Sequence, residues 1–146
     1  PDEALGEQRG AQYFGGRAEA KSFVVADAAF SGRRLEALEE LRWALDNGTA
    51  SVLVTSAFAG SARGLARFKA ATSRGRGMRD ADLAREVGVP PWKIRTLRDQ
   101  AKGWSEDGLV AAIRAVAQAD ADVKGAASDA SYTLERLVLT IAALRS

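Results

Sequence analysis

Residues 80–104 read DADLAREVGVPPWKIRTLRDQAKGW and contain two short helical patterns, 80–87 and 91–102, which meet at the turn 88–91. Apolar residues recur about one helical turn apart in each pattern, which predicts two amphipathic helices packed against a core. These apolar positions are Leu83, Ala84 and Val87 in the first helix and Ile94 and Leu97 in the second. The spacing matches a helix-turn-helix motif, in which Gly88 would make the tight turn.

The helix-turn-helix pattern has two interpretations. It fits a DNA-binding regulator whose second helix enters a major groove. It also fits any pair of crossed helices, because two helices in contact need a small residue and a permissive turn at the same places. The Pro90-Pro91 pair stands where a small polar residue is commoner in DNA-reading motifs. Spacing alone leaves both interpretations open.

The second helix of this pair begins with an aromatic residue among cations. Trp92 is followed by Lys93, Arg95 and Arg98. In one interpretation the indole stacks on an unpaired base or on the end of a duplex, while the three cations hold phosphates. In the other, Trp92 is a partly buried aromatic of the core or of a subunit interface. We take these four residues as the candidate DNA-binding site.

Two further helices are predicted on the C-terminal side. Ser105 is a suitable N-cap for a helix over 106–124, and a last helix starts at about Asp129. Trp104 precedes the cap and is expected to pack against the start of that helix. The apolar stripes are Leu109, Ile113, Val116 and Val123 in the first helix, and Leu134, Leu137, Val138, Ile141 and Leu144 in the last.

Three helices are predicted on the N-terminal side, over 22–30, 33–47 and 50–72. The second carries Leu35, Leu38, Leu41 and Leu45 along one face. The third begins with aliphatic residues that also suit a strand, but its apolar spacing continues well past strand length. Residues 1–20 are polar and interrupted by four glycines, which suggests a linker. The chain is therefore expected to be an all-α bundle of six to seven helices without a sheet.

The composition rules out several kinds of catalytic site. The chain has no cysteine and no histidine, which excludes thiol and imidazole nucleophiles and nearly every zinc site. It has no glycine-rich loop of the ATP-binding type, and Asp120 is expected to pair with Lys124 at i+4 rather than to act as an acid. We therefore predict no enzyme activity, no catalytic residue, no metal and no cofactor.

The net charge of +2 predicts no partner, but the cations are unevenly distributed. Residues 63–79 contain six basic residues and no acid. Such a cluster attracts phosphate, although a solvated basic loop has the same composition. No apolar run is long enough to span a bilayer, so no membrane partner is expected.

Taken together, these residues resemble the C-terminal part of the delta subunit of the bacterial DNA polymerase III clamp loader, in its actinobacterial form. The resemblance runs through most of the chain in an order specific to that family. The matching segments are YFGGRAEAKSFVVADAA (13–29), EALEELRWAL (36–45), DLAREVGVPPWKIRTLRDQAKGW (82–104) and DADVKGAASDASYTLERLV (120–138).

The resemblance implies a domain organisation. Delta subunits of this family have an ATPase-like first domain without ATPase function, a small helical lid and an all-helical collar. By similarity, residues 1–16 are expected to be the tail of the lid, or a linker, and residues 17–146 the collar. The chain starts at Pro1 without an initiator methionine, so we expect a piece of a longer protein. The family's first domain grips the sliding clamp, so this piece alone should neither bind the clamp strongly nor hydrolyse ATP.

The resemblance also implies partners and a location. In the family, collar domains of delta, of three ATPase subunits and of delta-prime pack into a ring, and the loader works on primed DNA. The expected interface lies mostly on helices 33–47 and 50–72, with the last helix contributing. Its candidate residues are Leu38, Arg42, Trp43, Phe58 and Arg63. The implied location is cytoplasmic, in the replisome at the nucleoid. The alternative function is a sequence-specific helix-turn-helix regulator that uses residues 80–102.

Overall fold

The computed structural model describes residues 2–74, 77–125 and 129–145, with side chains from residue 16 onward. These ranges contain seven α-helices and no strand, which confirms the expected all-α bundle. The helices are α1 (Asp2–Phe30), α2 (Arg34–Asp46), α3 (Ser51–Arg74), α4 (Asp80–Val87), α5 (Lys93–Ala101), α6 (Glu106–Lys124) and α7 (Ala130–Leu144). None of them is both long and apolar enough to cross a membrane.

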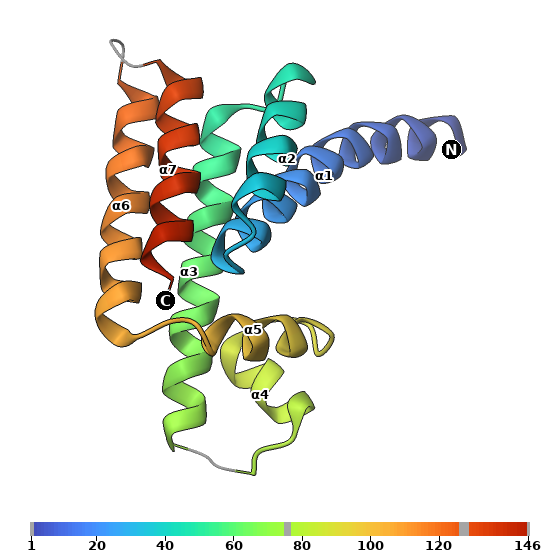
Figure 1. Ribbon diagram of the computed structural model, residues 1–146. Coiled ribbons are helices and arrows are strands. Elements are labelled where there is room, and N and C mark those ends of the chain that lie inside the picture. The colour runs from blue at the N-terminus through green and yellow to red at the C-terminus, as the bar shows by residue number, and fades with distance from the viewer. Residues whose placement is uncertain (1, 75–76, 126–128, 146) are drawn as a thin grey trace.

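Helix α3 is the central element of the bundle. It packs against α1, α4, α5, α6 and α7. Figure 1 shows α6 and α7 beside the upper part of α3, and the short α4 and α5 around its lower part. This arrangement explains why α3 is one long helix, since its apolar residues have partners along its whole length. Val54, Phe58, Leu65 and Phe68 are all buried.

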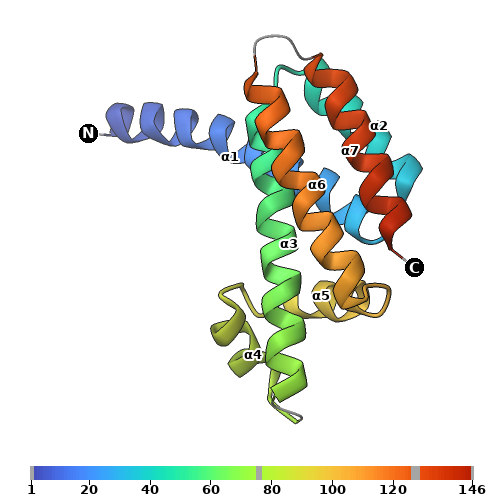
Figure 2. The same cartoon turned by 90° about the vertical axis from the view of Figure 1, so that its left-hand side faces the viewer.

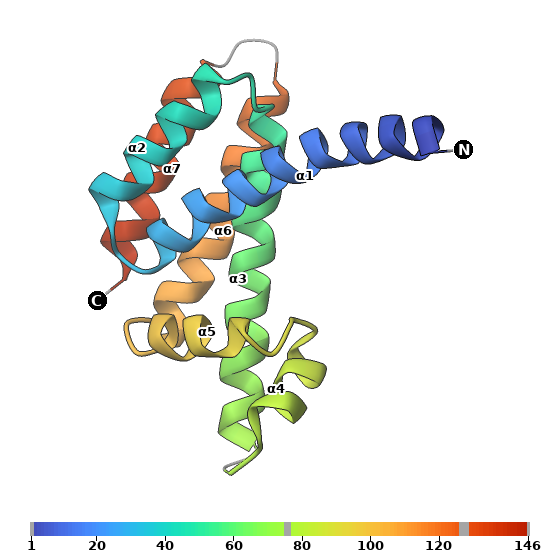
Figure 3. The same ribbon diagram turned by 90° about the vertical axis from the view of Figure 1, so that its right-hand side faces the viewer.

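Helix α1 crosses the bundle and then leaves it. Figures 2 and 3 show its N-terminal half extending away from the other helices. The sequence prediction of a linker over 1–20 and a helix from Ser22 was wrong, because a single helix starts at Asp2. Its last turns are covered by α2, α3 and α7, which accounts for the burial of nearly every residue from Val25 to Phe30.

The end of α1 is fixed by one aromatic cluster. The Phe30 ring lies 6.0 Å from the Phe58 ring and 5.4 Å from the Trp104 ring, measured between centroids. Trp104 is 3% exposed, and its Nε1–H donates to the Phe30 carbonyl oxygen over 2.9 Å. Trp104 therefore does more than pack at the start of α6, because it joins that region to the end of α1.

Two apolar stripes differ from the sequence prediction. In α2 the buried residues are Ala37, Leu41 and Ala44, whereas Leu35 is 69% exposed. Leu35 lies about 120° around the helix from Leu41, since each residue turns the helix by about 100°. In α6 the buried residues are Leu109, Ala112, Val116 and Ala119, while Ile113 stands at the edge of the stripe and is 43% exposed.

Helices α6 and α7 both begin at a side-chain cap. Ser105 Oγ accepts the backbone N–H of Gly108 at the start of α6, as predicted. Asp129 does the same for the N–H of Tyr132 at the start of α7. In α7 the predicted stripe is confirmed: Leu134, Leu137, Val138 and Ile141 are buried and Leu144 is partly buried.

Candidate nucleic-acid and subunit interfaces

The hairpin of α4 and α5 has the geometry that its sequence predicts. Gly88 ends α4 with a left-handed backbone (φ 86°), a conformation that glycine adopts without steric cost. The N–H groups of Gly88 and Val89 both donate to the Ala84 carbonyl oxygen, over 2.8 and 3.0 Å. All five apolar residues predicted to face the core are buried: Leu83, Ala84, Val87, Ile94 and Leu97.

Trp92 lies on the surface where this hairpin turns. The Pro90 carbonyl accepts the N–H of Lys93 and the Pro91 carbonyl accepts that of Ile94, so the chain makes a turn before α5 begins at Lys93. Trp92 therefore stands just outside the regular helix and is 73% exposed. Its interpretation as a core aromatic was wrong, and an interface or stacking role is what its position allows.

Lys93 contacts α1 rather than solvent. Its Nζ lies 2.5 Å from Asp27 Oδ2, and the two side chains are only 15% and 25% exposed. The same Nζ is 5.9 Å from the centroid of the Trp92 ring. Further along α5, Gln100 Nε2 donates to the Asp27 carbonyl oxygen and to Ser31 Oγ, each over 3.3 Å. Helix α5 is thus joined to α1 at both of its ends.

The other two predicted phosphate contacts differ from each other. Arg98 forms an ion pair with Asp80 over 2.6 Å, with both side chains largely exposed, and its guanidinium lies 5.7 Å from the centroid of the Phe68 ring. An exposed pair of this kind is weak and exchanges readily with other ions. Arg95 is exposed and has no ion pair within the described ranges. Of the four candidates, Trp92 and Arg95 are therefore the most available to a ligand.

The basic segment 63–79 runs from α3 to Arg79, the residue that precedes α4. Arg63, Arg67 and Arg79 are exposed, and no ion pair involves them in the described part of the chain. Arg74 is paired with Glu86 over 2.9 Å. Arg76 lies outside the described residues. This segment thus presents accessible cations along α3 rather than only in a loop.

The five residues predicted for a subunit interface have different accessibilities. Phe58 is fully buried in the core, so its assignment to an interface was wrong. The residue falls on the inner face of α3, where it meets Phe30. Trp43 is 52% exposed, Arg42 and Arg63 are exposed, and Leu38 is partly buried.

Trp43 belongs to a small cluster formed by α1 and α2. The Lys21 ammonium lies 4.4 Å from the centroid of the Trp43 ring, and it also pairs with Glu40. These contacts hold the indole in place while half of its surface remains accessible. An ordered, exposed aromatic is a common anchor in protein interfaces.

Asp120 makes the predicted pair with Lys124 and one contact that the sequence did not reveal. Its carboxylate accepts from Lys124 Nζ over 2.6 Å and from Thr55 Oγ1 of α3 over 2.7 Å. The hydrogen bond from Lys124, and then that from Thr55, lowers the pKa of Asp120 below its ordinary value. The carboxylate stays ionised and joins α6 to α3. No cluster of three or more acidic side chains suited to a metal ion occurs among the described residues.

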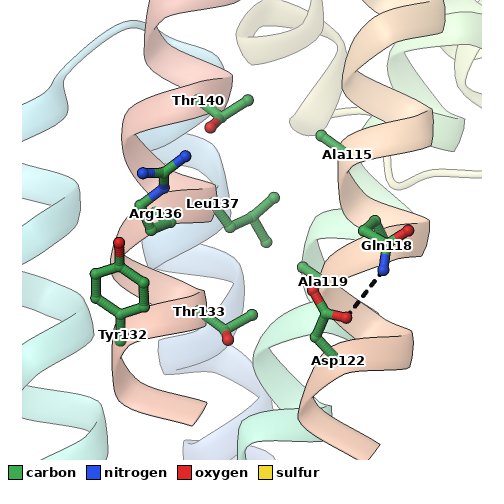
Figure 4. Close-up of a pocket in the computed structure, with 9 residues that line it drawn as sticks. All are labelled: Ala115, Gln118, Ala119, Asp122, Tyr132, Thr133, Arg136, Leu137 and Thr140. Carbon is green, nitrogen blue, oxygen red and sulfur yellow. Dashed lines mark hydrogen bonds between the residues drawn. The ribbon is translucent and has the colours of Figure 1, made fainter. Parts of the chain in front are cut away.

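A shallow groove between α6 and α7 was not predicted. Its volume is about 460 Å³, and Figure 4 shows the two helices contributing its walls. Within α6, Gln118 Nε2 donates to Asp122 Oδ1 over 2.9 Å. On α7, the Arg136 guanidinium lies 6.0 Å from the centroid of the Tyr132 ring. These groups give the groove a mixed polar wall.

The comparisons with known proteins agree with this geometry. No curated protein matches the chain. Among solved structures, the Bacillus subtilis DNA clamp loader delta protein is similar, with a TM-score of 0.72 and 21% sequence identity. The match covers 86% of this chain but only 37% of that chain. At this level of identity the likeness shows a shared fold.

The family comparison extends over most of the sequence. The family described as DNA polymerase III delta subunit, C-terminal domain, matches residues 19–141. That range runs from within α1 into α7, so it includes the α4–α5 hairpin as part of one larger domain. The match confirms the resemblance found in the sequence, and it gives no support to a separate helix-turn-helix regulator. The chain belongs to the DNA polymerase III delta subunit family, of which it contains the C-terminal domain.

Proposed function

We propose that this chain is the collar-forming part of a clamp-loader delta subunit and acts in DNA replication by assembly rather than catalysis. The observation that carries the proposal is the match of residues 19–141 to the C-terminal domain of that subunit family. Its partners would be the ATPase subunits and the delta-prime subunit of the loader, in the cytoplasm at the replisome. Half-exposed aromatic and aliphatic side chains on outer helix faces support this role, since partner surfaces need such anchors.

The proposed domain boundary falls inside a helix. We assign residues 17–146 to the collar and residues 1–16 to the end of the preceding lid. Helix α1 continues across this boundary from Asp2 to Phe30 without a break. A lid and a collar joined in this way would be connected by a helix rather than by a flexible linker, so that movement of one is transmitted to the other.

The proposed subunit interface lies mostly on α2 and α3, with α7 contributing. Trp43 is its anchor, held by Lys21, and Leu38 and Arg42 are further proposed contacts on α2. Arg63 on α3 remains a proposed contact. The interface is expected to bury Trp43, which a partner surface can do because half of the indole is accessible.

The proposed DNA contact is the exposed turn at the start of α5. Trp92 would stack on an unpaired base or a duplex end, a contact worth roughly 1–3 kcal/mol per base. Arg95 would bind a phosphate. Arg98 would leave its ion pair with Asp80 and bind a phosphate instead. Lys93 would act by holding α5 on Asp27, so that the indole is presented at a fixed angle.

The two exposed tryptophans allow one experiment to test both surfaces. The complete delta subunit carrying Trp43→Ala or Trp92→Ala is mixed with the ATPase and delta-prime subunits. Assembly is measured by sedimentation, and affinity for a primed single-strand/duplex junction by fluorescence anisotropy. Trp43→Ala should weaken assembly, whereas Trp92→Ala should assemble normally and bind the junction about 5- to 100-fold more weakly, the range expected from one stacked base.

Each variant is the control for the other. Normal assembly of Trp43→Ala, together with normal assembly after truncation of Leu38 and Arg42, would contradict the proposed interface. Unchanged junction affinity of Trp92→Ala at low salt would contradict the proposed DNA contact. Failure of the wild-type protein to join the ATPase subunits would contradict the proposed function as a whole.

A further inference from the structure

A small pocket lies where α1 crosses α3 beside the α4–α5 turn, and no function has yet been assigned to it. Figure 3 shows α1 crossing α3 above the α4–α5 pair. The pocket has a volume of about 230 Å³. Its walls include Phe23 and Asp27 from α1, Ser61, Arg63 and Arg67 from α3, and Lys93 from α5. We call it the Ser61 pocket.

The charge of the Ser61 pocket favours an anion. Arg63 and Arg67 are four residues apart on α3, so they lie on neighbouring turns of the same face. Both are exposed, and neither has an ion pair within the described ranges. The other two charges, on Lys93 and Asp27, neutralise each other through their ion pair. The two arginines are therefore left to attract a phosphate group, which guanidinium binds well.

The wall of the pocket also holds two polar atoms without partners. Ser61 is 7% exposed, and its Oγ makes no hydrogen bond. Asp27 Oδ1 is likewise buried and makes none, although Oδ2 of the same carboxylate binds Lys93. Buried polar atoms are nearly always hydrogen-bonded, so a ligand that supplies partners for this pair would be stabilised in the pocket. A carboxylate oxygen can only accept, so that ligand must also bring a donor.

The remaining wall is apolar. Phe23 is 43% exposed, and Val87 and Val89 of the α4–α5 hairpin also line the pocket. A flat ring fits against such a surface, as bases do on aromatic side chains. Phosphate alone would meet the arginines but would make no contact with Phe23.

We propose that the Ser61 pocket binds one unpaired nucleotide whose base carries an amino group. Its phosphate lies on Arg63 and Arg67, its base lies against Phe23, and its amino group donates to Asp27 Oδ1, with Ser61 Oγ as a second partner. Adenine, cytosine and guanine carry such a group and thymine does not. Both oxygens are covered in the empty pocket, so binding requires a wall side chain to move, and the two long arginines are suited to this.

The nucleotide has two potential sources. It is either one residue of a single strand or a free mononucleotide, and the chemistry of the pocket is the same for both. A single strand would be supplied by the DNA contact at Trp92, so this version of the proposal rests on the proposed function. A free mononucleotide would not depend on it.

The test is a titration of the 146-residue chain followed by the backbone amide signals in NMR. The probes are dAMP, dCMP, dTMP and inorganic phosphate, and then a thymidine oligonucleotide with or without one central adenine. With dAMP and dCMP, the signals of Gly60, Ser61 and Gly64 should shift. The affinity for dTMP and for phosphate should be about tenfold lower, which corresponds to one lost charge-assisted contact.

Two variants and one control identify the contacts. Arg67→Gln should weaken dAMP binding about tenfold, and Ser61→Ala should reduce the preference for dAMP over dTMP. Arg114→Gln on α6 removes an exposed arginine that does not line the pocket. It should change neither the affinity for dAMP nor the preference for dAMP over dTMP. Shifts confined to other regions, equal affinity for phosphate and dAMP, equal affinity for dTMP and dAMP, or no effect of Arg67→Gln would each overturn the proposal.

The oligonucleotide distinguishes the sources and separates this proposal from the proposed function. Tighter binding of the adenine-containing strand than of dAMP identifies a single strand as the ligand, and the reverse identifies a free nucleotide. Trp92→Ala should weaken binding of the adenine-containing strand but leave the affinity for dAMP unchanged. If Arg67→Gln no longer binds dAMP while Trp92→Ala binds the junction normally, the pocket proposal is supported and the proposed DNA contact at Trp92 is contradicted. The opposite pattern would contradict the pocket alone.

Discussion

The Nε1–H of Trp104 donates to the carbonyl oxygen of Phe30, a residue 74 positions earlier in the chain, over 2.9 Å. This bond closes the aromatic cluster at the end of α1 and satisfies a backbone group that α1 leaves unpaired where it ends. Trp92, only twelve residues before Trp104, is largely exposed instead. The two tryptophans therefore provide a matched comparison between a structural and a surface role.

We expect Trp104→Phe to lower the free energy of unfolding by about 1–3 kcal/mol, because the buried Phe30 carbonyl loses its partner. Trp92→Phe should change it by less than about 0.5 kcal/mol, since the ring is on the surface. Urea unfolding followed by circular dichroism measures both. Equal losses in the two variants would show that the hydrogen bond has no special importance.

The ion pair between Lys93 and Asp27 should contribute more to the stability of the fold than the ion pair between Arg98 and Asp80. The first is largely shielded from solvent and the second is exposed. Double-mutant cycles with alanine should give a coupling energy of roughly 0.5–3 kcal/mol for the first pair. For the second they should give less than about 1 kcal/mol. A larger coupling in the exposed pair would be inconsistent with the described burial.

Replacing Gly88 or Gly64 by alanine should have opposite effects on the stability of the fold. Gly88→Ala forces a side chain into the left-handed region, which costs about 1–2 kcal/mol. Gly64 is inside α3, where an added Cβ would lie 3.9 Å from Leu97 Cδ2, an ordinary contact. Gly64→Ala should therefore stabilise the fold by about 0.5–1 kcal/mol. Thermal unfolding distinguishes them, and destabilisation by Gly64→Ala would mean that α3 and α5 pack more closely than described.

The Asp120 carboxylate should make stability depend on pH in the acidic range. Hydrogen bonds from Lys124 and Thr55 place its pKa in the folded state below the ordinary value of 3.8. Its contribution is therefore complete above that value and is lost as the pH falls through the lower folded-state pKa. The difference in unfolding free energy between the wild type and Asp120→Asn should be constant at neutral pH and shrink in acid. A difference that grows in acid would contradict the direction of the shift.

The helices were predictable because their signals are local. Apolar periodicity identified α2 to α7, and residues such as Ser105 and Gly88 marked helix ends through contacts with their own neighbours. Local signals failed at the start of α1, where the glycines predicted an interruption of the helix. Glycines cost only about 1 kcal/mol each inside a helix, so they weaken it without ending it.

The candidate site was less predictable because it depends on residues distant in sequence. The sequence placed Trp92, Arg95 and Arg98 in one short helix, but it gave no signal that Asp27 would hold Lys93. Phe58 was assigned to an interface, whereas it falls on the inner face of α3 in contact with Phe30. Which face of α3 is innermost depends on how the neighbouring helices pack against it, and the periodicity of one helix does not reveal that packing.

The position of α7 has a consequence for synthesis of the protein on the ribosome. Helix α7 covers parts of α1, α2, α3 and α6, although it is the last helix in order. The apolar sides of the earlier helices stay uncovered until α7 has emerged from the exit tunnel. During that interval the nascent chain exposes apolar surface, so its need for chaperones should persist until α7 has left the tunnel.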